Sequence, residues 1–108
     1  MSAKLYYDLE DFKASIVALG NSLNEYPESK YREEILFLIL KSNYLLAFNS
    51  ILSKQKERYQ ATLDEYYSFI TEYPESKYRK EADRMHAASS KILKGETDTL
   101  NNANNIIK

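Results

Sequence analysis

The sequence predicts an all-α protein of the α-solenoid kind, built from helical hairpin repeats, with about four main helices and an N-terminal helix remnant. Three observations support this fold class. The octet EYPESKYR stands at residues 25–32 and again at residues 72–79, an offset of 47 residues. Apolar residues around both copies recur with the period of an α-helix. Glycine and proline, which are common in turns and loops, number only two each in 108 residues.

An identical octet in so short a chain indicates one structural unit stacked on its copy. Before each octet, apolar side chains also match at the same offset, in steps of three and four that place them on one helical face. They are Phe12, Ile16, Leu19, Leu23 and Tyr26 in the first copy, and Tyr59, Leu63, Tyr66, Ile70 and Tyr73 in the second. Each octet is therefore predicted to form a corner between two helices.

Each residue of a corner has its own expected task. Pro27 and Pro74 lack an N–H group and push the preceding tyrosine out of the helical region, so a helix must end there. The serine two residues later can cap the following helix. The residues assigned a structural role at the corners are Tyr26, Pro27, Ser29, Tyr31, Tyr73, Pro74, Ser76 and Tyr78.

The elements follow in order from this pattern. A helix remnant ends near Asp8, and a tight turn at residues 9–11 leads into a helix that ends near residue 26. A longer helix runs from about residue 29 into the forties, and another from about residue 54 to residue 73. The pattern is stretched between residues 47 and 58, which leaves two readings open: longer helices or an inserted loop.

The last helix, residues 76–94, is expected to cap the array. It carries Asp83, Arg84 and His86 where the first copy has Leu36, Phe37 and Ile39, so it keeps a single apolar stripe, as a terminal repeat requires. Gly95 is expected to end it. The repeat domain then covers residues 1–94, and residues 95–108 form a polar, disordered tail.

At the other end, residues 5–8 resemble the end of a helix that begins further upstream. We therefore expect the chain to be the C-terminal part of a longer protein.

Composition argues against several functions. Fifteen Lys and Arg face sixteen Asp and Glu, without the basic excess that nucleic acid binding requires. The longest apolar run, residues 35–40, is far shorter than the roughly 20 residues of a membrane span, so a soluble chain is expected. His86 is the only histidine and cysteine is absent, which predicts no metal site and no cofactor. Without a nucleophile context or a Gly-rich phosphate loop, we expect no enzyme.

The turn YDLEDF at residues 7–12, the helix ending in Tyr26-Pro27 and the following ESKYREE at residues 28–34 resemble tetratricopeptide repeats. More narrowly, the Tyr-Pro-Glu-Ser-Lys-Tyr corner with its long helices resembles the outer-membrane assembly lipoproteins of the BamD (YfiO-like) family, over roughly residues 4–94. In that frame residues 10–26 are the second helix of a partial repeat, residues 28–73 one full extended repeat, and residues 76–94 the capping helix.

The resemblance implies a protein–protein interaction scaffold of the outer-membrane β-barrel assembly machinery, with the barrel protein BamA or other assembly subunits as partners. It also implies a place on the periplasmic face of the outer membrane. The family is anchored by a lipidated N-terminal cysteine, and this chain has none. Its attachment would therefore belong to a portion upstream of it.

Two groups of residues are candidate partner contacts. Lys54, Lys56 and Arg58 begin a helix, where cations oppose the helix dipole, so a contact with an acidic surface is one reading and a solvated hairpin end the other. Tyr67 and Phe69 lie beside the core stripe, where the first copy has Gly20 and Ser22. They either contact a partner or pack on a neighbouring helix.

Two further hypotheses stay open. The chain could instead be a periplasmic repeat protein of the cell envelope, either an accessory or a ligand-binding protein, which would need a pocket with converging polar groups. The exposed apolar start, residues 4–12, could also make the fragment self-associate.

Overall fold

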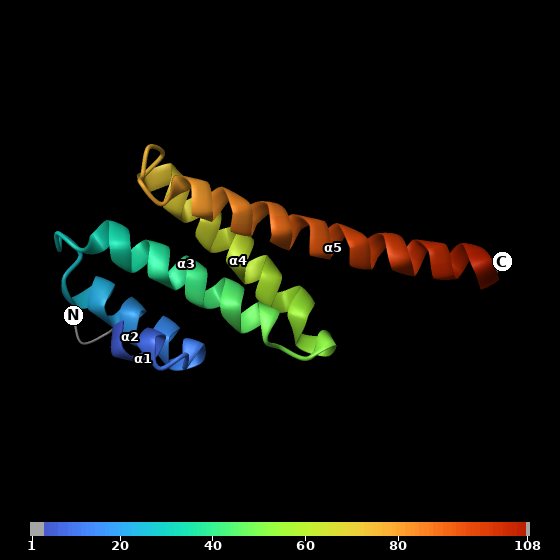
Figure 1. Ribbon diagram of the computed structural model, residues 1–108, viewed down its shortest axis with the longest axis horizontal. Coiled ribbons are helices and arrows are strands. Elements are labelled where there is room, and N and C mark those ends of the chain that lie inside the picture. Colours follow the sequence, from blue (N-terminus) through green and yellow to red (C-terminus); the bar gives the residue numbers. More distant parts are fainter. Residues whose placement is uncertain (1–3, 108) are drawn as a thin grey trace.

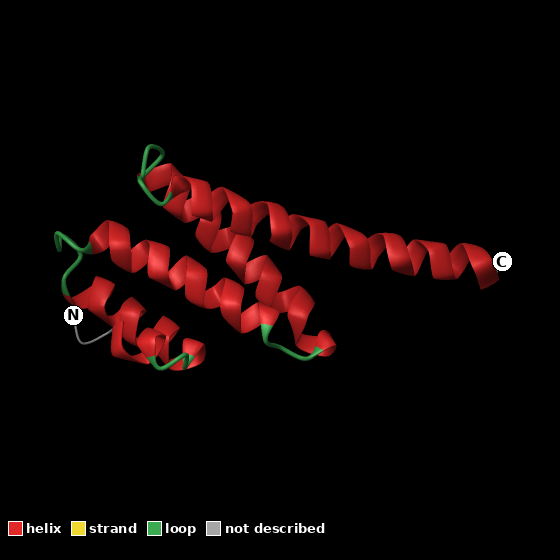
Figure 2. Cartoon of the chain, in the orientation of Figure 1, coloured by secondary structure: helices red, strands yellow, loops and turns green. Residues whose placement is uncertain are grey.

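The computed structural model describes residues 4–107, with side chains described as far as Gly95. Within this range the chain forms helices joined by short loops, without a strand (Figures 1 and 2). The helices are α1 (Leu5–Asp8), α2 (Phe12–Glu25), α3 (Arg32–Phe48), α4 (Leu52–Glu72) and α5 (Arg79–Ile107). The predicted all-α fold of stacked helical hairpins is confirmed.

The helices stack in chain order. α3 packs against both α2 and α4, α5 packs on α4 and touches α3, and α1 packs on α2. The array measures 56 × 28 × 19 Å, and its long dimension includes the C-terminal part of α5, which extends past the other helices in Figure 1.

The central helix α3 is buried on two sides, which explains why it is apolar nearly all round. One buried cluster lies between α2 and α3 and comprises Leu19, Ile35, Leu38 and Ile39. A second lies between α3, α4 and α5 and comprises Phe37, Leu40, Tyr66, Phe69, Ala82 and Met85. The two clusters use different faces of α3, so this helix joins the layers of the stack.

The predicted turn at residues 9–11 is present between α1 and α2. Glu10 adopts a left-handed backbone conformation, with φ 61°, which reverses the chain. Asp11 then caps α2, because its carboxylate accepts a hydrogen bond of 3.2 Å from the N–H of Ala14.

The stretch between residues 47 and 58 consists of longer helices. α3 continues to Phe48 and α4 begins at Leu52, so only residues 49–51 form the loop, and the inserted-loop reading is wrong. At the corners, the helices begin at Arg32 and Arg79, three residues after the serines. The Ser29 and Ser76 hydroxyls accept hydrogen bonds of 3.1 and 3.0 Å from the N–H two residues on, which orders the turn ahead of each helix.

The predicted end of the last helix near Lys94 is wrong, because α5 continues through Gly95 to Ile107. A glycine inside a helix costs about 1 kcal/mol relative to alanine but does not have to end it. It ends a helix when it takes a left-handed conformation, and no glycine in the described chain does so. The expected disordered tail, residues 95–108, is therefore helical as far as Ile107, and Lys108 lies outside the described residues.

The division into a partial repeat, a full repeat and a capping helix stays a prediction.

Across the part of the chain that the structure describes, no helix is both long and apolar enough to cross a membrane.

Candidate functional site

The structure separates the five residues predicted as partner contacts. Lys54 and Lys56 are exposed in the first turns of α4. Arg58, one turn further, is partly buried and donates a hydrogen bond from Nη1 to the Ser50 hydroxyl, so it holds the α3–α4 loop. Tyr67 is exposed on the same helix, more than three turns after Lys54.

Phe69 is 1% exposed and leaves no surface for a partner. Its ring packs on Phe37 of α3, with the ring centroids 5.9 Å apart. The prediction of a partner contact is wrong for this residue, because it lies on the face of α4 that packs against α3. The side chain is larger than that of Ser22 in the first copy, and it fills the contact between α4 and α3.

The two corners share backbone contacts but differ in side-chain burial. In both, the arginine that begins the next helix donates to the proline carbonyl, Arg32 to Pro27 at 2.9 Å and Arg79 to Pro74 at 2.8 Å. At the second corner Tyr78 stacks on Phe37, with centroids 4.4 Å apart and rings 9° from parallel, while Tyr73 packs beside Phe69.

At the first corner, by contrast, Tyr26 and Tyr31 are exposed. The second corner packs on α3 of the preceding layer, and no described helix occupies that position at the first corner. The structural role predicted for these two tyrosines is therefore not visible in side-chain packing.

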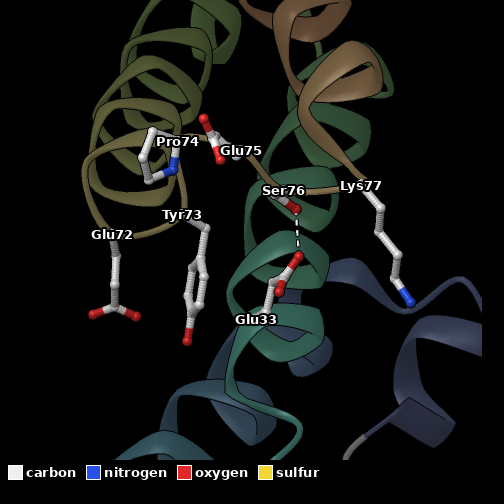
Figure 3. Close-up of a pocket in the computed structure, with 7 residues that line it drawn as sticks. All are labelled: Glu33, Glu72, Tyr73, Pro74, Glu75, Ser76 and Lys77. Atoms are coloured by element: carbon white, nitrogen blue, oxygen red, sulfur yellow. Dashed lines mark hydrogen bonds between the residues drawn. The ribbon is translucent and has the colours of Figure 1, made fainter.

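The second corner also forms an open cleft of about 560 Å³ beside α3 (Figure 3). It is lined by Glu33, Glu72, Tyr73, Pro74, Glu75, Ser76 and Lys77. The Ser76 hydroxyl donates to Glu33, and Figure 3 shows these two side chains pointing toward one another. Hydrogen bonds from Arg32 of 2.7 and 3.0 Å lower the pKa of Glu72. These bonds connect α3 to the second corner. The residues of the cleft therefore serve mainly to hold the two helical layers together.

No histidine or cysteine lines the cleft beside its carboxylates. Among the residues that the structure describes, no three His, Cys, Asp or Glu side chains are grouped so as to hold a metal ion.

Tyr66, Tyr67 and His86 form an aromatic cluster where α4 meets α5. Tyr67, 51% exposed, shares a hydrogen bond of 3.1 Å between its hydroxyl and Nε2 of His86. The His86 ring stacks on buried Tyr66, with centroids 4.3 Å apart, and both rings form T-shaped contacts with Tyr67. The Tyr67 ring is therefore held in place while half of its surface faces solvent.

A hydrogen bond to Asp83 holds Tyr66, the ring on which His86 stacks. The Tyr66 hydroxyl donates to Asp83 at 2.6 Å, and Arg79 donates to the same carboxylate oxygen at 2.9 Å. Hydrogen bonds from Tyr66 and Arg79 lower the pKa of Asp83. Burial, followed by the bond to Asp83, raises the pKa of Tyr66. The charged carboxylate and the neutral phenol are thus the favoured forms, and they fix the orientation of the ring on which His86 stacks.

The first repeat has an apolar contact at the equivalent place. Leu19 and Ile39, both in the buried α2–α3 cluster, correspond at the 47-residue offset to Tyr66 and His86, and Gly20 corresponds to Tyr67. The sequence comparison identified Tyr67 by its size but missed the role of His86. The appearance of Asp83 and His86 at positions that are apolar in α3 was the signal that could have identified it.

The layer at residues 76–95, from the second corner into α5, is basic. The two carboxylates within this range form ion pairs inside the protein, Glu81 at 2.7 Å with Lys41 of α3 and Asp83 with Arg79. Over residues 76–95 the cations are Lys77, Arg79, Lys80, Arg84, Lys91 and Lys94. This range therefore carries an excess of positive charge, while on α4 the carboxylates Asp64 and Glu65 stand within one turn of Tyr67.

Comparison with known proteins places this arrangement in a family. A family model described as YfiO, outer membrane lipoprotein, matches residues 1–99. No curated protein sequence matches the chain. The matched range includes both corners and all the residues of the aromatic cluster.

Proposed function

We propose, because this chain belongs to the YfiO family of outer membrane lipoproteins, that it is a protein–protein interaction scaffold of the outer-membrane β-barrel assembly machinery. Its partner is the periplasmic portion of the barrel protein BamA or another assembly subunit, and it acts on the periplasmic face of the outer membrane. Attachment to that membrane is through a lipid anchor, as the family description of a lipoprotein implies.

One observation carries the proposal: Tyr67 is exposed and yet fixed by Tyr66 and His86. Residues that dominate binding energy at protein interfaces are often tyrosines, and a side chain already held in one rotamer loses little entropy when a partner covers it. A fold that needed Tyr67 only for packing would bury the ring, as α4 buries Phe69. We call Tyr67 and His86 the α4–α5 face.

The charge of the layer at residues 76–95 indicates the chemistry of the partner. Arg84 and Lys91 are exposed on α5, whereas Glu81 and Asp83 are paired within the chain. An acidic patch on the partner would be attracted to this layer and oriented on it, which raises the association rate more than the final affinity.

The alternative of a ligand-binding accessory protein has less support. The corner cleft is open, and its Glu33 and Glu72 side chains already have partners in Ser76 and Arg32. A ligand would have to displace these bonds, which join the layers. Lys54 and Lys56 lie about 16–20 Å along α4 from Tyr67, at 1.5 Å per residue, so we treat them as a separate contact.

Calorimetric titration against the soluble periplasmic domains of BamA from the same organism tests the proposal. The informative pair of variants is Tyr67→Ala and Tyr26→Ala, because the two tyrosines are 51% and 61% exposed and lie on different parts of the molecule. Tyr67→Ala should raise Kd roughly tenfold or more, as expected for an interface hot spot. Tyr26→Ala should leave Kd unchanged.

Absence of binding, or equal losses in both variants, would contradict the proposed function. Sedimentation of the chain alone at several concentrations controls for self-association through residues 4–12, where Leu5 and Leu9 are exposed. A circular dichroism spectrum of each variant checks that the helices are retained.

A further inference from the structure

The loop between α3 and α4 exposes three large apolar side chains. Phe48 is 62% exposed, Ile51 70% and Leu52 84%. We call residues 48–52 the hairpin tip. None of these three side chains belongs to either buried cluster, so packing within the chain does not account for their apolar character.

The polar side chains of the hairpin tip bond to the last turn of α3. The Asn49 amide donates to the Leu45 carbonyl at 2.9 Å, and the Ser50 hydroxyl donates to the Leu46 carbonyl. Arg58 in turn donates to the Ser50 hydroxyl. These bonds satisfy carbonyl groups in the last turn of α3 and fix the loop. The Asn49 and Ser50 side chains are therefore bonded to α3, and the large side chains that the tip exposes are apolar.

Two exposed lysines stand beside this apolar surface. Lys54 and Lys56 lie in the first turns of α4, where a cation opposes the helix dipole, and neither forms an ion pair with a described carboxylate. The acidic neighbours are Glu57 on α4 and, across the adjacent cleft, Glu10 and Asp11, which line it together with Lys13 and Arg58.

We propose that the hairpin tip inserts Phe48, Ile51 and Leu52 into the surface of an anionic phospholipid bilayer, with Lys54 and Lys56 at the headgroups. Apolar side chains at the headgroup boundary with nearby lysines are the combination that binds proteins to the surface of anionic membranes. This contact goes beyond the proposed function and does not depend on which protein the α4–α5 face binds.

A membrane fits the observations better than a protein partner. The three side chains project from the end of a hairpin, and a protein would need a matching groove to receive them, whereas a bilayer accepts apolar side chains without shape complementarity. Members of the family are outer membrane lipoproteins, so a bilayer surface is close by.

A single tip of this size binds weakly alone, and membrane anchoring generally takes two signals. The tip would therefore orient a chain that is already held at the membrane.

Site-specific fluorescence tests the contact, because the chain contains no cysteine. Leu52→Cys is labelled with an environment-sensitive nitrobenzoxadiazole dye, and Tyr26→Cys is the matched control, since residue 26 lies at the opposite end of α3 and is 61% exposed. Both are titrated with vesicles of phosphatidylethanolamine and phosphatidylglycerol, and with vesicles of phosphatidylcholine. We expect a blue shift at position 52 with the anionic vesicles, a smaller one with phosphatidylcholine, and none at position 26.

Vesicle flotation of the unlabelled chain gives a second measurement. The double variant Ile51→Ser, Leu52→Ser should lower the bound fraction at limiting lipid roughly tenfold, because apolar burial drives insertion. Lys54→Glu with Lys56→Glu should lower binding to the anionic vesicles only. Tyr26→Ser should change neither.

No blue shift with either vesicle, an equal shift at positions 52 and 26, or flotation unaffected by the serine double variant would overturn the proposal. Loss of binding to the BamA domains in that double variant, without vesicle binding by the parent chain, would make the tip a protein contact instead. Neither result affects the Tyr67 test, so the two proposals fail separately.

Discussion

The hydroxyl groups of Ser15 and Ser42 form a hydrogen bond of 3.0 Å between α2 and α3, with both side chains fully buried. At the 47-residue offset the same two positions are Thr62 of α4 and Ser89 of α5. Thr62 donates to the Arg58 carbonyl in its own helix, at 3.1 Å, and the buried Ser89 hydroxyl has no hydrogen-bond partner. Serine and threonine in helices commonly bond back to the carbonyl four residues earlier, and the Thr62 hydroxyl does so instead of bonding Ser89.

This difference predicts opposite effects of two equivalent substitutions. Ser42→Ala should destabilise the protein by about 1–2 kcal/mol, because it leaves the buried Ser15 hydroxyl unpaired. Ser89→Ala should be neutral or stabilising, since it removes a buried group that lacks a partner. Urea unfolding of both variants measures the pair, and equal losses would show that the two layers do not differ in this way.

The stacking of Tyr78 on Phe37 gives a second matched pair. Tyr78→Ala should lower the free energy of unfolding by about 2–3 kcal/mol, because it removes a packed ring from the joint between layers. Tyr31→Ala, at the same position of the exposed first corner, should change it by less than about 0.5 kcal/mol. Thermal unfolding checks both, and Tyr78→Phe, which keeps the ring, is the control. A large loss from Tyr31→Ala would mean that the first corner is packed in solution.

The bond between Arg32 and Glu72 predicts a pH dependence. Arg32 holds the pKa of Glu72 below its ordinary value of 4.5, so the pair contributes stability that is fully present above that value. This contribution is lost as the pH falls through the lower pKa of the folded state. Glu72→Gln should therefore be less stable than the parent near neutral pH, with a difference that shrinks in acid. Stability curves of both chains against pH measure it, and a difference independent of pH would contradict the assignment.

Glu10 provides a test of backbone strain. Its φ of 61° is unfavourable for a residue with a side chain, and its N–H donates to the Tyr7 carbonyl at 2.9 Å. Glu10→Gly should stabilise the protein by about 0.5–1 kcal/mol, because the relief of strain exceeds the added entropy of the unfolded chain. Glu10→Ala, which keeps the strain, should not stabilise it. The same gain in both variants would assign the effect to loss of the charge.

The repeat allowed most of the fold to be predicted from the sequence. Identical octets and matching apolar steps are local signals, and the structure turns at both corners as they indicate. Gly95 was misread because a glycine only permits the left-handed conformation that ends a helix. The length of the α3–α4 loop depends on how many turns of the two helices pack against each other. The wider spacing of apolar residues between positions 47 and 58 does not determine that number.

The candidate site was less predictable for a related reason. Tyr67 and Phe69 differ by two positions on one helix, and both are large where the first copy has small residues. The neighbouring helix decides which of them is buried, and only the arrangement of α3, α4 and α5 shows that Phe69 faces Phe37 while Tyr67 faces His86. The role of Arg58 in fixing Ser50 likewise depends on the closed loop.

Hydrogen–deuterium exchange of the chain, free and saturated with the periplasmic domains of BamA, tests the central claim most directly. The account predicts slower amide exchange around Tyr67 in α4 and around His86 in α5 when the partner is bound, with α2 unchanged. Protection confined to α2 and the first corner, or no protection at saturation, would contradict the assignment of the α4–α5 face as the partner-binding surface.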